Sequence, residues 1–555
     1  MDKRTFLAIV LSLAVIVTYH LFFSKPPVKQ PLTEQKTTEQ KTMAAATADS
    51  KAQAISPPVA GQANAPQIAQ QAAAPVVAPE KFVTVDTPFY TAVFTTNGGA
   101  LKSFRLKGYR KTIDKNSDLI EMINVQPDMP APLSVSFPGS SIDVPVGSAF
   151  EANVQALDLT KGSDTKQLTF TQTFPGRVRI EKIYTFYPGK YAFDLEVRMY
   201  NLTAEPIGES SGLSWYAYVD PAVETDSYTH EGPVAFVKKD VERPEVKKME
   251  AETSMGPGVT WGGFESKYFI SAMIPQNPSL TSIVMAKNAT SHLVSVSLRG
   301  AKNIIPAGQA GIFSYTLFLG PKDHSILKAQ GAHLEDAIDF GSWLKWLAMP
   351  MLFVLKFFNQ YINNYGLSII LLTVLIKIIF WPLGNKSYES MKEMQKLQPK
   401  MQEMREKYKD DKQRLSQETM ALYKAHKVNP LGGCLPMVIQ IPVFFGLYKT
   451  LLYAIELRHS PLFWWIQDLS APDTLFGHVY GFAVGPLPIL MGATMFIQQK
   501  MTPMGGDPMQ AKIMLWMPVI FTVMFLNFPS GLVIYWLFNN IISIGQQYYI
   551  NKRHA

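Results

Sequence analysis

The sequence predicts a multi-domain membrane protein with six transmembrane helices, a large antiparallel β-sandwich and a cytoplasmic helical hairpin. Long apolar segments occur at the N-terminus and recur through the C-terminal part of the chain, whereas residues 81–330 alternate with a period of two. A strongly polar segment, residues 385–429, interrupts the second apolar region. The composition, 47% hydrophobic and only 17% charged, fits a membrane protein with a soluble portion better than a wholly soluble protein.

The N-terminal segment is predicted to be an uncleaved signal anchor. Residues 1–23 begin MDKR and continue as an apolar run from Thr5 to Phe23, and no small-x-small cleavage pattern follows. The positive-inside rule places the N-terminus in the cytoplasm. Residues 24–80 are rich in Pro, Gln, Ala, Thr and Lys and bury too little apolar surface to fold, so we expect a disordered tether.

Residues 81–330 are predicted to form the β-sandwich, on the far side of the membrane from the N-terminus. Runs such as QLTFTQTF and HLVSVSLRG are rich in β-branched and aromatic residues and are separated by turn-forming residues. Trp215, Tyr216, Trp261 and Phe264 are expected in the core or on a sheet face. A partner-binding surface or a carbohydrate groove is the alternative for these aromatic side chains.

Residues 331–351 are predicted to form an amphipathic helix lying in the membrane interface. Its apolar residues recur with helical spacing, and two tryptophans are among its aromatic residues, which is typical of interfacial helices. Pro350 is expected to end the helix. The apolar face is predicted to comprise Phe340, Trp343, Leu344, Leu347 and Met351.

Residues 352–555 are predicted to hold five membrane-spanning helices, with the hairpin 385–429 after the first. The hairpin carries eleven Lys or Arg against seven Asp or Glu, so the positive-inside rule places it in the cytoplasm together with both termini. The third and fourth spans are short and would thin the local bilayer. The predicted spans are Tyr365–Trp381, Leu431–Ile455, Phe482–Ile497, Ile513–Phe528 and Leu532–Tyr549.

Lys377 is the principal candidate for a functional residue, because it is a cation inside an otherwise apolar run. Such a residue costs about 2.5–3.5 kcal/mol at mid-bilayer depth on insertion scales. No Asp or Glu lies in any later apolar run, so either Lys377 reaches the interface near Trp381 or it faces a hydrated cavity. Thr373, one turn earlier on the same face, favours the cavity. Further polar residues at span depth fit the same hydrated recess: Gln440, Thr522, Asn527, Asn539 and Ser543.

The hairpin is predicted to consist of two helices joined near Lys409, with Pro399 kinking or dividing the first. A methionine stripe follows the first helix, and it has two interpretations. It either packs on the second helix, which runs from about Lys412 to Lys427, or offers adaptable side chains to varied apolar segments. Basic residues around it are suited to ribosomal RNA or anionic lipid. The stripe comprises Met391, Met394, Met401 and Met404.

The sequence contains no pattern for catalysis or for a cofactor. There is no Walker-type phosphate loop, no HExxH and no paired-Cys spacing, and the single Cys434 excludes an intrachain disulfide. A secondary transporter is the main alternative, but it would predict internal repeats and midplane carboxylates, and neither occurs. An intramembrane protease would need Ser530 of FPSG as its nucleophile, whereas this motif is typical of a turn.

Several longer motifs resemble the YidC family of bacterial membrane protein insertases, which is related to the mitochondrial oxidase-assembly insertases. They are WGGFESKYFISAMIP, KSYESMKEMQKLQPKMQEMREKY, the NPLGGC segment with its following proline, and FPSGLVIYW. The resemblance covers nearly the whole chain. It implies a five-helix core with a hydrophilic groove open to the cytoplasm and to lipid, and a periplasmic supersandwich of the sugar-mutarotase type without sugar activity.

The resemblance also implies site residues. The family's groove cation falls on Lys377, where many relatives carry Arg, so this chain keeps the charge without the bidentate guanidinium. Trp536 replaces the second aromatic residue of a more usual Tyr pair. The family's substrate contacts fall on Gln440, Ile441, Met524, Phe525, Tyr535 and Trp536.

The partners implied by the resemblance are nascent membrane proteins, the Sec translocon with its accessory subunits, and membrane lipid. On the cytoplasmic side they include the ribosome and the signal recognition pathway. The resemblance further implies a multi-pass protein of the bacterial inner membrane that works as a monomer and without a cofactor.

Overall fold

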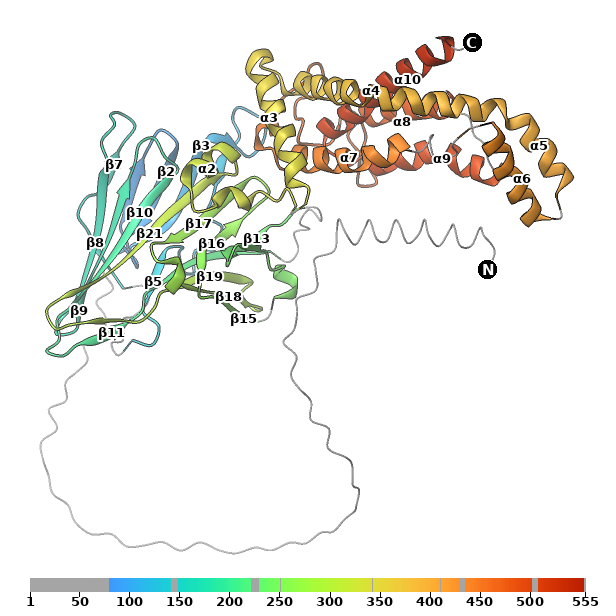
Figure 1. Ribbon diagram of the computed structural model, residues 1–555. Coiled ribbons are helices and arrows are strands. Elements are labelled where there is room, and N and C mark those ends of the chain that lie inside the picture. The colour runs from blue at the N-terminus through green and yellow to red at the C-terminus, as the bar shows by residue number, and fades with distance from the viewer. Residues whose placement is uncertain are drawn as a thin grey trace, which may run out of the picture. The chain divides into compact units, whose positions relative to one another are not determined.

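The computed structural model describes residues 79–140, 148–220, 229–249, 251–341, 343–409, 411–426, 428, 435–501 and 508–553 (Figure 1). The predicted anchor, residues 1–23, lies outside the described residues, as do Cys434 and all but the last two residues of the predicted tether.

The described part of the β domain is built around a nine-stranded antiparallel sheet. In spatial order, its strands are β14 (Asp240–Glu242), β13 (Gly232–Val237), β16 (Val259–Glu265), β17 (Phe269–Pro275), β21 (Ala310–Pro321), β10 (Ala192–Asn201), β9 (Val178–Phe186), β8 (Lys166–Phe174) and β6 (Glu151–Ala152).

Over the described residues, two five-stranded sheets complete the sandwich. The strands of the first are, in order, β4 (Leu119–Glu121), β3 (Ala100–Arg110), β2 (Tyr90–Thr95), β1 (Phe82–Asp86) and β7 (Ala156–Asp158). Those of the second are β15 (Glu252–Met255), β18 (Ser282–Asn288), β19 (Leu293–Arg299), β12 (Gly212–Tyr218) and β5 (Ser134–Ser136). A separate short pair consists of β11 (Ile207–Glu209) and β20 (Asn303–Ile305), and β20 contacts β21 of the nine-stranded sheet.

The alternating sequence pattern puts one face of each central strand into the core. Every second residue of β9 is buried, because successive side chains of a strand point to opposite faces. Phe94 of the first five-stranded sheet packs on Tyr184 of the nine-stranded sheet, with ring centroids 4.7 Å apart. Trp215 and Trp261 are buried, in line with the expected core role. The fold departs from a purely antiparallel sandwich at one edge, where β7 pairs with β1 in parallel.

The predicted interfacial helix 331–351 has the wrong bounds. After α2 (His324–Gln330), residues Leu334–Ala337 form the short 3-10 helix η3, and the long helix α3 spans Lys345–Ile362. Pro350 lies inside α3 and does not end it. A proline removes one backbone hydrogen bond, and here packing outweighs the loss, because α3 packs against α4 and α7 and buries Ala348 and Met351 on either side of Pro350.

Five further long helices match the five predicted spans in order. They are α4 (Tyr365–Lys396), α7 (Leu435–Tyr453), α8 (Pro486–Met501), α9 (Pro508–Phe525) and α10 (Ser530–Arg553). Among the described residues, α4 is the helix long and apolar enough to cross a membrane by length and composition, and Leu515–Phe525 of α9 is a shorter apolar stretch.

Helix α10 packs against α4 and α8, and α8 against α9. Two glycines permit close approach between these helices. A Cβ atom on Gly384 of α4 would meet Gln546 Nε2 at 2.8 Å, and one on Gly492 of α8 would meet Thr522 Oγ1 at 2.0 Å. A side chain at Gly492 would force the helices apart because Thr522 is short, whereas one at Gly384 would displace the flexible end of Gln546.

The helix α4 continues without a break beyond the predicted span and forms the first part of the predicted hairpin. It passes Pro382 and ends at Lys396, and the chain then turns at Leu397 into α5 (Gln398–Lys407). Helix α6 (Lys412–Ala425) returns beside α5 (Figure 1). Pro399 is near the start of α5, so the prediction that it divides the first hairpin helix is confirmed.

Candidate functional site

Lys377 turns toward α10 rather than along its own helix toward Trp381. Its Nζ donates a hydrogen bond to Ser543 Oγ over 2.7 Å, and Ser543 Oγ donates to the Asn539 carbonyl oxygen over 2.7 Å. Among the described carboxylates, none lies within ion-pair distance of Lys377 Nζ. The amine thus lies between two helices. The interpretation in which Lys377 faces a cavity requires this arrangement, whereas the interpretation in which it reaches the membrane interface near Trp381 does not.

Gln440 extends the same polar region to α7. Its Nε2 donates to the hydroxyl oxygen of Tyr535 at 3.1 Å and to Asn539 Oδ1 at 2.9 Å. Asn539 and Ser543 are one helical turn apart on α10, so side chains from α4 and α7 meet the same stripe of α10.

The polar stripe of α10 continues toward its C-terminal end. Gln546 Nε2 donates to Asn385 Oδ1 at 2.8 Å and to the Trp381 carbonyl oxygen at 3.2 Å. On the other side of α10, Asn540 bonds Thr494 of α8 and Gln547 bonds the Met501 carbonyl oxygen. The sequence prediction missed Asn385, Asn540, Gln546 and Gln547. Their signal is the recurrence of amide and hydroxyl residues every three or four positions from 539 to 547.

Three of the polar residues predicted to line the recess do not join this cluster. Thr373 is buried, and its hydroxyl donates to the Ile369 carbonyl oxygen of its own helix. Thr522 likewise bonds the Pro518 carbonyl oxygen. Asn527 Oδ1 accepts the backbone N–H of Ala483. Intrahelical bonding of this kind is common for threonine, which explains why proximity in sequence to Lys377 did not place Thr373 in the cluster.

The apolar candidates divide into exposed and buried groups. Ile441 and Met524 are 40% and 47% exposed, whereas Phe525 and Tyr535 are each 1% exposed. Trp536 packs on Phe525 at 5.0 Å and is also surrounded by Phe444 and Phe521. In this arrangement Ile441 and Met524 are available for contact from outside, and the buried aromatic residues support the helices behind them.

The methionine stripe is likewise uneven. Met401 is buried, and the hydroxyl of Tyr423 in α6 lies 3.1 Å from its sulfur, so this methionine packs on the second hairpin helix. Met391, Met394 and Met404 are only partly buried. Packing therefore accounts for Met401, while the other three retain surface for a ligand.

Ser530 has a structural role. Its N–H and its hydroxyl both bond the Ala471 carbonyl oxygen, each at 2.8 Å. A hydroxyl held by a backbone carbonyl at the start of α10 fits the turn interpretation of FPSG rather than a nucleophile.

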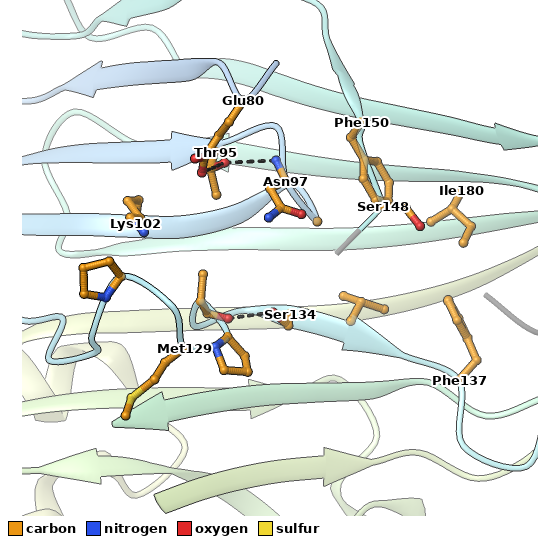
Figure 2. A pocket seen from close by; sticks show the side chains of 15 residues that line it. Glu80, Thr95, Asn97, Lys102, Met129, Ser134, Phe137, Ser148, Phe150 and Ile180 are labelled. Atoms are coloured by element: carbon orange, nitrogen blue, oxygen red, sulfur yellow. Dashed lines mark hydrogen bonds between the residues drawn. The ribbon is translucent and has the colours of Figure 1, made fainter. Parts of the chain in front are cut away.

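The β domain contains a cavity of about 150 Å³, away from the predicted site residues (Figure 2). Polar groups on its wall bond within the chain, as Thr95 does to Glu80 and Ser134 to the Ala131 carbonyl oxygen. Next to it, the fully buried Lys182 donates to the carbonyl oxygens of Gly98, at 3.0 Å, and Leu133, at 2.8 Å. Burial lowers the pKa of Lys182 to about 7.

Ion pairs surround the segment between the β domain and α3. Glu265 pairs with Lys322 at 3.1 Å and with Arg243 at 2.6 Å, and all three side chains are largely buried. Asp339 pairs with Lys449 of α7 at 2.9 Å. Burial by itself would raise the pKa of Asp339, but Lys449 and Arg243 lower it to about 2.

Two family models match consecutive parts of the chain. The model described as YidC periplasmic domain matches residues 82–354, and the model described as 60Kd inner membrane protein matches residues 357–555. A membrane protein insertase YidC of Syntrophus aciditrophicus is 64% identical over 555 residues, with 100% of both chains covered. One from Pelobacter propionicus is 44% identical over 561 residues and covers 100% of this chain and 99% of its own.

Solved structures with lower identity are also similar. A crystal structure of an active YidC insertase has a TM-score of 0.37 at 20% identity and covers 86% of this chain and 94% of its own. A galactose mutarotase-like protein from Lactobacillus casei has a TM-score of 0.28 at 12% identity and covers 43% of this chain and 100% of its own. The two family models and the full-length relatives together show that the chain belongs to the YidC family of membrane protein insertases.

Proposed function

We propose that a nascent hydrophobic segment enters the membrane along the polar cluster of Lys377, Ser543, Asn539 and Gln440 and leaves it past Ile441 and Met524. The chain is a membrane protein insertase of the bacterial inner membrane, and its substrates are nascent membrane proteins. Its full-length relatives carry the name of insertases, which sets aside the alternative of a secondary transporter.

The proposed topology has six spans, namely residues 1–23 and helices α4, α7, α8, α9 and α10. Both termini and the α5–α6 hairpin lie in the cytoplasm, the β domain lies in the periplasm, and α3 lies in the outer interface. Helix α8 has 16 residues and α9 has 18, so at about 1.5 Å per residue they are shorter than a hydrocarbon core of about 30 Å. A thinner bilayer beside these two helices would lower the free-energy barrier to moving a polar flank of the substrate across the membrane.

The observation that carries the proposal is the hydrogen bond from Lys377 to a neutral partner. A serine satisfies one of the three donors of an ammonium group but does not neutralise its charge. The remaining positive potential favours a polar or acidic flank of the substrate, whose transfer into the apolar layer is otherwise costly. Once the flank has crossed, burial of the apolar segment in lipid contributes about 25 cal/mol per Å².

On the cytoplasmic side, we assign first contact with the substrate to the partly buried methionines Met391, Met394 and Met404, with Met401 as the packing residue that holds the hairpin together. Basic residues of the hairpin suit the ribosome and the signal recognition pathway. The Sec translocon with its accessory subunits is the proposed partner on the membrane side, and one copy of the chain is the proposed working unit. No step requires a cofactor.

Photocrosslinking to a ribosome-arrested substrate tests the route. A crosslinker replaces Met524, and the matched control replaces Leu490 of α8, which is 48% exposed against 47% for Met524. We expect capture from Met524 and little from Leu490, with a second strong position at Ile441. Equal capture from both helices, or capture only from periplasmic loops, would reject this route.

A further inference from the structure

The segment between α7 and α8 ends in an exposed apolar hairpin that the insertion route does not use. We call residues 474–484 the aromatic hairpin; its strands β22 (His478–Val479) and β23 (Phe482–Ala483) pair in antiparallel fashion. From residue 474 to residue 486 the sequence contains no Lys, Arg, Asp or Glu. Its large apolar side chains are nevertheless exposed: Leu475 52%, Phe476 62%, Val479 50%, Tyr480 98% and Phe482 42%.

The base of the aromatic hairpin is held firmly by polar contacts. The buried Asp473 accepts the N–H of Leu487 at 2.9 Å and the indole N–H of Trp465 at 3.2 Å. Asn527 accepts the N–H of Ala483 at 2.8 Å. The base of the hairpin is therefore fixed to the helices. The side chains at the tip are exposed even though the hairpin that carries them is held in place.

These same contacts place the hairpin at one end of the helices. Leu487 lies in the first turn of α8, Asn527 is the second residue after the end of α9, and Ser530 at the start of α10 bonds Ala471. All three helix ends meet here, so for helices that cross a bilayer this is the level of the membrane surface. A segment fixed at that level is in reach of the outer lipid interface.

The turn at the tip contains Tyr480 in a backbone conformation that is unfavourable for tyrosine and lowers the stability of the hairpin. Tyr480 and Gly481 both have positive φ, 51° and 81°, as a two-residue hairpin turn of the primed type requires. Asn or Gly relieves the strain of the first position, whereas a tyrosine there costs free energy. Since Tyr480 is 98% exposed, contacts with the described part of the chain do not offset that cost.

We propose that the aromatic hairpin inserts Tyr480 and its apolar neighbours into the headgroup–acyl boundary of the outer leaflet, as a lipid anchor for this end of the insertase core. Tyr and Trp favour this layer because one end of the ring is apolar and the other can hydrogen-bond. Trp464, 78% exposed and stacked on Trp465 at 5.8 Å, adds a second aromatic group on the same segment. An uncharged tip fits zwitterionic lipid and has no means of selecting anionic headgroups.

The inference rests on the proposed topology, and lipid quenching tests it apart from insertion. Val479→Cys, in a Cys434→Ser background, carries a nitrobenzoxadiazole probe, and the protein is placed in phosphatidylcholine nanodiscs. We expect stronger loss of fluorescence with a nitroxide near the headgroup than with one near the acyl-chain end. The same probe at Ile304→Cys in the β domain, 77% exposed, should lose little with either lipid.

A second variant separates anchoring from turn geometry. Tyr480→Asn suits the backbone better, so we expect equal or higher thermal stability in detergent together with weaker quenching of the Val479→Cys probe. Quenching at position 479 no stronger than at 304, or unchanged by Tyr480→Asn, would overturn the anchor. Two further outcomes would also overturn the anchor. One is quenching that occurs only when the nanodiscs contain phosphatidylglycerol. The other is shielding of the probe from the quencher by a protein that can be crosslinked to the hairpin.

Substrate insertion by the same variants is measured separately. Loss of insertion with quenching intact counts against the proposed function alone, and intact insertion without quenching counts against the anchor alone.

Discussion

Lys377 Nζ of α4 donates a hydrogen bond over 2.7 Å to Ser543 Oγ of α10, a residue 166 positions later in the chain. The contact joins the two helices through a charge and a neutral hydroxyl. A carboxylate in place of Ser543 would bind the amine more strongly but would cancel the charge that the proposed route assigns to contact with a substrate flank. The neutral partner therefore orients the ammonium group and leaves its potential available.

A substitution series at Lys377 tests whether positive charge is required. We expect Lys377→Arg to support insertion of a substrate with an acidic flank and Lys377→Glu to abolish it. In Lys377→Met, loss of one charge-assisted contact of about 1.5–3 kcal/mol should reduce insertion roughly ten- to hundredfold. Ser543→Ala, which keeps the charge, should have a smaller effect. Wild-type insertion by Lys377→Met would contradict the role of Lys377.

The amide of Gln440 is expected to stabilise the contact between α7 and α10. Gln440→Leu leaves the buried Tyr535 hydroxyl and Asn539 Oδ1 without this donor, at a cost of about 1–3 kcal/mol for an unsatisfied group. Thermal unfolding in detergent should have a lower midpoint for Gln440→Leu than for the wild type. The control Ile441→Leu, at the neighbouring exposed position, should leave the midpoint unchanged. In the Gln440→Leu background Tyr535→Phe should cost less than in the wild type; strict additivity would show that the two groups are not coupled.

Lys182 should make the stability of the β domain depend on pH. Its pKa is about 7 when folded and 10.5 ordinarily, so the unfolded chain binds more protons between these values, and stability should rise by about 1–4 kcal/mol from pH 7 to pH 10. Lys182→Met should flatten this slope in guanidinium unfolding of the full chain followed by tryptophan fluorescence. The exposed Lys161→Met serves as the control and should retain the slope.

Acid should weaken the attachment of the segment before α3 to α7. The pKa of Asp339 is about 2 against an ordinary 3.8, so the stability that it contributes is present above about pH 4 and is lost as the pH falls toward 2. Its side chain is 35% exposed, and solvent screening limits the effect to about 1 kcal/mol. Asp339→Asn should remove this acid dependence of the melting temperature; the matched Asp336→Asn, at the pair with Lys345, should leave it in place.

The two interpretations of the methionine stripe predict different results along the hairpin. Met401→Ala removes a buried side chain and should destabilise the α5–α6 pair by about 2 kcal/mol, which would appear as faster proteolysis of the hairpin. Met394→Ala should leave proteolysis unchanged and lower crosslinking of the hairpin to an arrested substrate. Equal proteolysis of both variants would assign the whole stripe to packing.

Local sequence patterns predicted much of the fold. A period of two marks strands, and a long apolar run marks a helix; both signals depend only on neighbouring residues, so the described strands between Phe82 and Pro321 and the five long helices from α4 to α10 follow the expected order. Prolines were less informative. Pro350 and Pro382 lie inside helices whose packing offsets the lost hydrogen bond, whereas Pro399 is near the start of α5, where its missing N–H costs little.

The sequence by itself determined that Lys377 is a cation in an apolar helix with no acid in the later spans to neutralise it. Only the tertiary structure decided which polar groups meet it, because contact depends on how each helix is rotated about its axis and on pairs distant in sequence. Spacing placed Thr373 on the face of Lys377, yet its hydroxyl is satisfied by its own helix, while Ser543 is the group that the amine reaches. The same rotation buries Phe525 and Tyr535 and leaves Ile441 and Met524 at the surface.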